Sequence, residues 1–186
     1  FFVLIQKYYT MPSIGSTFQT FTSTSRQYNL ANYSWNSPSS AVFSDNAYSS
    51  FIYSGPFGSD PVSGTGATFA YFDATNLYLK VPTGATIDGI GVSIERQGSY
   101  VEGNINVYDD HIYLIYNGSV ISNNKSTAAS WADSLDQLDK FPSSGTETDL
   151  WGASLTDTIV NNSGFGIRIG AKATYSGQSL TGLPKI

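Results

Sequence analysis

Hydrophobic and polar residues alternate along several short stretches of the chain, and this period of two predicts β-strands. The clearest stretch spans residues 87–96, and its apolar positions predict one buried face: Ile90, Val92 and Ile94. A second stretch, 164–175, predicts an inward face made of Phe165, Ile167 and Ile169. A shorter strand is expected over 76–79, ending at the turn Pro82-Thr83-Gly84.

A β-hairpin is predicted in the middle of the chain. The β-rich run 105–116 ends at Asn117-Gly118, and Val120 and Ile121 begin a return strand. Asn-Gly is a strong hairpin signal because a type I′ turn needs positive φ at both central residues, which these two tolerate best.

No long segment shows the 3.6-residue period of an amphipathic helix. The one helical or irregular candidate is 127–139, where Trp131, Leu135 and Leu138 are spaced i, i+4 and i+7. Short strands separated by turns therefore predict an all-β fold, an antiparallel β-sandwich of jelly-roll type with a short irregular or helical insertion near 127–139.

The chain divides into an N-terminal arm and linker, 1–35, and a β-sandwich domain, 36–186. The arm begins with an apolar run: Phe1, Phe2, Val3, Leu4 and Ile5. A bilayer span takes about 20 residues, so this run is too short to cross a membrane. We expect it to form a strand that docks on another element.

Composition narrows the possible functions. Charged residues make up 12% of the 186 residues, against about 25% in an ordinary domain, with one His and no Cys. Few groups are left for acid-base or metal chemistry, so we predict no catalytic residue, cofactor or metal. The net charge of −5, with scattered Lys and Arg, argues against nucleic acid as a partner.

Two groups of carboxylates are candidate sites. His111 follows Asp109 and Asp110, but strand alternation places Asp110 on the face opposite the other two, so the group does not converge. The second candidate is a set spaced by three residues: Asp133, Asp136 and Asp139. We favour a solvated helix face over a calcium site, because the EF-hand order of ligands is absent.

Aromatic residues make up 15% of the chain, including 13 Tyr. Exposed Tyr suits protein interfaces or stacking on sugars, and we favour the interface. Trp131 and Trp151 are interpreted as plugs at the ends of the sandwich, and Phe165 as an inward-facing strand residue.

Several further motifs occur in order along the second half of the chain. They are 77–96 with its Pro-Thr-Gly turn, Asp110-His111-Ile112-Tyr113-Leu114 with Asn117-Gly118, Asn124-Lys125, Trp131, Asp149-Leu150-Trp151-Gly152, Leu155-Thr156 and 161–167. In this order and spacing, residues 70 to 175 resemble a β-sandwich domain that recurs in bacteriophage virion proteins.

The resemblance implies a structural role in a phage particle and transfers no catalytic residue or cofactor. The expected location is the virion, and the expected partners are coat or tail proteins and other copies of this chain. Capsid decoration or a head fibre is favoured, since the chain has no long stalk of its own. The alternatives are a tail or receptor-binding module that binds a host-surface glycan, and a subunit of an extracellular filament or adhesin.

The chain departs from the resembling domain at its end. Residues 176–186 are short, polar and contain a Pro, so the closing strand is expected to be absent. An open sheet edge invites pairing with another strand. We therefore expect the arm 1–9, from the same or a neighbouring subunit, to fill that edge.

Overall fold

The protein is all-β and antiparallel, with one helix of four residues in the part described. The computed structural model describes residues 3–8, 22–26, 53–54, 67–68, 71–77, 79–100, 104–131, 137–141, 148–176 and 181–185. Its elements are β1 (Val3–Tyr8), β2 (Thr22–Arg26), β3 (Tyr53–Ser54), β4 (Ala67–Thr68), β5 (Tyr71–Thr75), β6 (Gly89–Tyr100), β7 (Asn104–Tyr116), β8 (Ser119–Val120), β9 (Gln137–Phe141), α1 (Asp157–Val160), β10 (Phe165–Ser176) and β11 (Thr181–Lys185).

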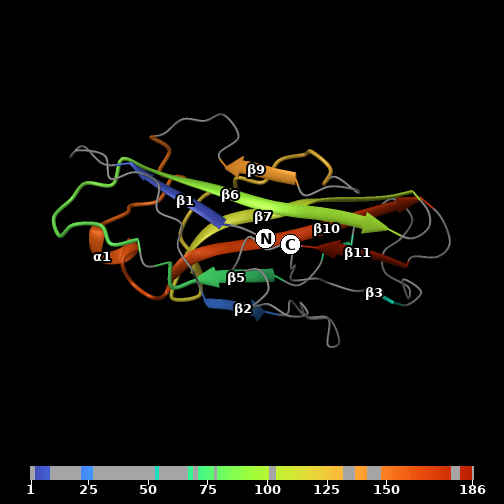
Figure 1. Cartoon of the computed structure of the whole chain (residues 1–186), viewed down its shortest axis with the longest axis horizontal. Helices are drawn as coiled ribbons and strands as arrows, with labels where there is room; N and C mark the ends of the chain where they lie inside the picture. Colours follow the sequence, from blue (N-terminus) through green and yellow to red (C-terminus); the bar gives the residue numbers. More distant parts are fainter. Residues whose placement is uncertain are drawn as a thin grey trace.

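The described strands form two sheets, and long β6, β7 and β10 run through the middle of the molecule (Figure 1). The first sheet has the order β1-β6-β11-β3, with β9 also paired to β6. The second has the order β2-β5-β10-β7-β8, with β4 also paired to β10. From β5 onward the chain passes repeatedly from one sheet to the other, so neighbours within a sheet are often distant in sequence.

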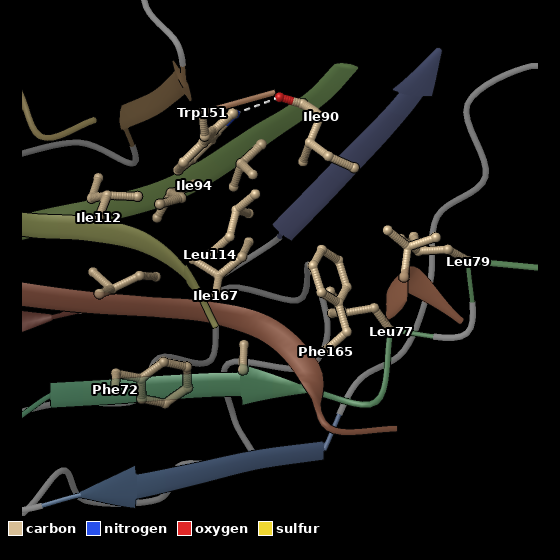
Figure 2. Packing of buried hydrophobic residues seen from close by; sticks show 14 of the residues in the cluster. Phe72, Leu77, Leu79, Ile90, Ile94, Ile112, Leu114, Trp151, Phe165 and Ile167 are labelled. Carbon is tan, nitrogen blue, oxygen red and sulfur yellow. Dashed lines mark hydrogen bonds between the residues drawn. The ribbon is translucent and has the colours of Figure 1, made fainter. Parts of the chain in front are cut away.

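One apolar cluster is shared by both sheets. Figure 2 shows Ile90 and Ile94 of β6 on one side and Ile112, Leu114 and Ile167 of the second sheet on the other. These five side chains are at most 2% exposed. Removing this much apolar surface from water is the main favourable contribution to folding.

The strongest sequence predictions are confirmed. β6 buries Ile90, Val92 and Ile94, and β10 buries Phe165, Ile167 and Ile169, as the alternation predicts. The hairpin also forms between β7 and β8, where Tyr116 pairs with Ser119. Asn117 and Gly118 have φ of 50° and 78°, the left-handed conformation that the two-residue turn requires.

The strand predicted over 76–79 is wrong. The strand is β5, which ends at Thr75, and Asn76 and Lys80 then take φ of 62° and 51°. Left-handed residues end the extended conformation. Leu77 and Leu79 are still buried in the core, but they reach it from a loop.

The helical alternative for 127–139 is also wrong where the structure describes it. Gln137, Leu138 and Asp139 belong to β9, which pairs with β6. The stretch 127–131 is irregular and makes one isolated bridge, between Ser130 and Tyr108. Residues 132–136, with Asp133 and Asp136, lie outside the described residues.

The expected absence of a closing strand is a further error. β11 forms near the C-terminus and pairs with both β6 and β3. Its sequence, TGLPK, has little strand propensity. Pairing with strands far away in sequence therefore decides its conformation.

Candidate functional site

Strand β1 contains three of the five residues predicted to form the docking arm. Its register places Val3 opposite Ile94, Leu4 opposite Ser93 and Ile5 opposite Val92 on β6. The other two, Phe1 and Phe2, lie outside the described residues. Because strand addition of this kind uses backbone hydrogen bonds, a second copy of the segment is able to bind in the same register.

β6 is the strand with which β1, β9 and β11 all pair. β1 pairs along Gly89–Ile94, β9 along Val92–Arg96 and β11 along Gln97–Tyr100. In Figure 1, β1 and β9 lie along β6, and β11 lies toward its far end. Each of these three strands therefore pairs with six residues or fewer of the long strand β6.

The edge of β7 that faces away from β10 pairs with β8 at Ile115 and Tyr116, and side-chain and backbone groups of residues 121–125 close the part before it. Asn124 Oδ1 accepts the backbone N–H of Ile112 at 2.9 Å, and Ser122 Oγ accepts that of Leu114 at 2.8 Å. The carbonyls of Ile112 and Leu114 accept N–H groups of the same segment at 3.0 Å. An edge whose backbone groups are satisfied in this way offers little to an incoming strand.

Replacing Asn124 by Ala should lower the free energy of unfolding by about 1–3 kcal/mol, because it leaves the buried N–H of Ile112 without its acceptor. The N–H of Ser126 loses the same oxygen. Urea denaturation measures the loss, with the exposed Ser119→Ala as the control. Equal stability of the two variants would show that the edge does not depend on Asn124.

A buried ion pair joins the two sheets. Arg96 of β6 contacts Asp109 of β7, and their side chains are 1% and 0% exposed. Trp131 Nε1 donates to Asp109 Oδ1 at 2.9 Å, and the Thr127 N–H donates to Oδ2 at 3.1 Å. The Arg96 guanidinium lies 5.3 Å from the centre of the Trp131 ring. The carboxylate is therefore surrounded by donors, the condition under which a buried charge is tolerated.

Trp151 packs in the core near the start of β6. Its side chain is fully buried, and Nε1 donates to the Ile90 carbonyl at 2.7 Å (Figure 2). Its backbone N–H donates to Asp149 Oδ1 at 2.6 Å, and Lys125 Nζ lies 2.6 Å from Asp149 Oδ2. Burial raises the pKa of Asp149, but the bonds from Lys125 and Trp151 outweigh it and hold the pKa below its usual value.

The third predicted interior residue, Phe165, is fully buried at the start of β10. It belongs to the same core cluster as Leu77 and Leu79, which are also labelled in Figure 2. Trp131, Trp151 and Phe165 are thus brought into one core. They are not placed beside β1 by any described contact.

The predicted faces of Asp109 and His111 are wrong because β7 contains a β-bulge. Ala171 pairs with Asp109 and Gly170 with His111, so Asp110 is an extra residue. The bulge turns Asp109 toward Trp131 in the core, whereas His111 stacks on Tyr113 on the other face. His111 Nδ1 instead lies 2.7 Å from Asp110 Oδ2.

Around His111 is a polar group that sequence reasoning did not assemble. We name it the His111 cluster: Asp110, His111 and Tyr113 of β7, Tyr71 and Asp73 of β5, and Arg168 of β10. Arg168 forms a bidentate pair with Asp73, with Nε–Oδ1 and Nη2–Oδ2 both 2.7 Å. Its hydrogen bonds to Asp73 raise the pKa of Arg168 despite burial.

Within the described residues, no group of three or more His, Asp or Glu side chains is placed to hold a metal ion. Nor does any helix there have the length and apolar character needed to cross a bilayer.

Comparison with known proteins adds no relative. No family model, curated protein or solved structure matches this chain.

Proposed function

We propose that the chain is a non-enzymatic structural protein of a bacteriophage particle, a capsid-surface decoration or head-fibre protein that assembles through edge strands and aromatic residues. The resemblance of residues 70–175 to a recurrent virion domain is the source of the phage assignment. The observation that carries the assembly mode is the pairing of the N-terminal strand β1 along β6.

The fold we propose for this role is a β-sandwich of jelly-roll type. Both sheets contribute to one apolar cluster, which is the arrangement of a two-layer β-protein. The successive strands β5, β6 and β7 lie in the second, first and second sheets, respectively. Crossing between sheets at successive strands is typical of jelly rolls, in which Greek keys are shared by two sheets.

The long strands of the two sheets differ in what covers them, and the difference favours β6 as the assembly strand. The side of β7 away from β10 is covered by β8 and by the segment that contains Ser122 and Asn124. β6, in contrast, takes its partner along 89–94 from β1, a strand of six residues. Exchange of a short strand between copies has a low cost, because the contacts made within one chain and between two chains are the same.

A cysteine pair distinguishes exchange from self-pairing. The chain has no Cys, so Leu4→Cys with Ser93→Cys introduces one cross-strand pair at opposed positions of the register. If β1 is exchanged, oxidation of the assembled protein gives covalent dimers or longer species on a denaturing gel. A cross-link confined to monomers, or no cross-link, would contradict assembly through β1. The single variant Leu4→Cys is the control.

Deleting residues 1–10 should abolish the oligomer and lower the melting temperature, because β6 loses its partner along 89–94. Deleting residues 1–2 alone leaves β1 intact and is the matched control. Light scattering after size-exclusion chromatography reads the oligomer, and calorimetry reads the melting temperature. An unchanged oligomer and melting temperature in the longer deletion would rule out the arm as an assembly element.

The same preparations separate the remaining alternatives. Open-ended polymers that grow with concentration would support a filament or adhesin subunit over a decoration protein, which forms closed oligomers or saturates a lattice. Binding of the isolated oligomer to a host-surface glycan would instead favour a tail or receptor-binding module.

A further inference from the structure

The only histidine of the chain is buried in an arrangement that suits its neutral form. His111 is 6% exposed, and the Asp110 carboxylate bonds to Nδ1. Since a carboxylate accepts hydrogen bonds, Nδ1 carries the proton and Nε2 has a free lone pair. Nε2 is fully buried and has no hydrogen-bond partner. Protonation would place a donor at this atom with no acceptor beside it, which is costly in a buried site.

The ring has little room to adjust in place. A Cβ on Gly170 would lie 2.4 Å from Cε1 and 2.5 Å from Nε2 of His111, so the ring packs directly on the β10 backbone. Tyr71 meets it edge-on with ring centres 4.3 Å apart, and Tyr113 stacks at 5.2 Å. A protonated ring therefore reaches water only by moving away from β5 and β10.

The charged neighbours act in both directions. Asp110 on β7 and Asp73 on β5 favour an imidazolium, whereas Arg168 on β10 opposes it. Asp73 is already bound in the bidentate pair with Arg168, which reduces its capacity to compensate a second cation. Tyr71 and Tyr113 are the remaining titratable groups that face the ring among the described residues.

We propose that the His111 cluster is an acid-sensitive switch, in which protonation of His111 loosens the packing between β5, β10 and β7 while the pairing of β6 within the first sheet remains intact. This property is independent of the phage assignment, because it depends on contacts within one chain.

The direction of the pH dependence follows from the folded state. Burial lowers the pKa of His111, and the opposing effect of Asp110 does not cancel it. The unfolded chain therefore binds the proton more readily, near the ordinary pKa of about 6.5. The stabilising contribution is complete above pH 6.5 and is lost as the pH falls toward the folded-state pKa.

Because the chain has a single His, its imidazole signals in an NMR titration are assigned without ambiguity. We expect a midpoint below that of a free imidazole. Hydrogen exchange then locates the opening. After correction for intrinsic rates, protection of β5 and β10 should fall between pH 7.5 and 5, by up to about tenfold per pH unit for one proton. Protection of β6 over 89–96 should stay constant.

Two variants keep the test decisive. His111→Gln carries no titratable group and should remove the difference between the two pH values. Asp110→Asn removes the carboxylate that favours the imidazolium, so the midpoint should move to lower pH even if the glutamine variant fails to fold. A midpoint at or above that of free imidazole, or an equal loss of protection in all strands, would overturn the proposal.

Discussion

Replacing Asp109 by Ala should lower the free energy of unfolding by about 3–5 kcal/mol, because it leaves the Arg96 charge buried opposite an empty site. Arg96 is 1% exposed, so water does not replace the lost carboxylate. The donors on Trp131 and Thr127 lose their acceptor as well. Chemical denaturation measures the change.

The control is the partly exposed ion pair between Lys125 and Asp149, whose side chains are 24% and 21% exposed. Lys125→Ala should cost at most about 1 kcal/mol. The double variant Arg96→Met with Asp109→Leu should recover part of the loss, since an apolar pair of similar volume removes the unpaired charge, whereas the donors on Trp131 and Thr127 still lack an acceptor. A loss from Asp109→Ala no larger than that of the control would contradict the role of the pair.

Replacing Trp151 by Ala should cost about 3–5 kcal/mol, the range for truncating a buried aromatic side chain. Its backbone adds an unusual feature, because Trp151 has a φ of 59°. A residue with a Cβ is strained there by about 1–2 kcal/mol relative to Gly. Trp151→Gly should therefore be at least as stable as Trp151→Ala, although Gly is ordinarily the less stable of the two.

Trp131 is the matched position, since it is also a buried Trp but is not among the described residues with positive φ. There the Gly variant should be less stable than the Ala variant. Thermal or urea unfolding of the four variants gives both differences. The same order of Ala and Gly at both positions would show that the strain at Trp151 is unimportant.

Local patterns were sufficient to predict the long strands. β6 and β10 alternate over enough residues to define a buried face, and Asn117-Gly118 specifies the hairpin by its own conformational preference. These local signals do not predict the conformation of a segment where long-range pairing or loop geometry determines it. Leu77 is buried from a loop after the left-handed Asn76, and β11 becomes a strand only because β6 and β3 lie beside it.

The inter-sheet ion pair was missed, although the sequence contains a signal for it. The inward positions of β6 recur every second residue and lead directly from Ile94 to Arg96. On β7 the same period leads from Val107 to Asp109. Opposite charges that continue two apolar faces predict a buried pair. The bulge at Asp110 carries no comparable signal, and it separates Asp109 from His111.

Counting copies of this chain in purified particles tests whether it has a structural role in a phage particle. Quantitative mass spectrometry with labelled peptides gives the ratio to the major coat protein. The proposal predicts that the chain is a stoichiometric component, present in hundreds of copies if it decorates the capsid lattice and in a few dozen or fewer if it forms fibres. Its absence from purified particles would contradict the proposal.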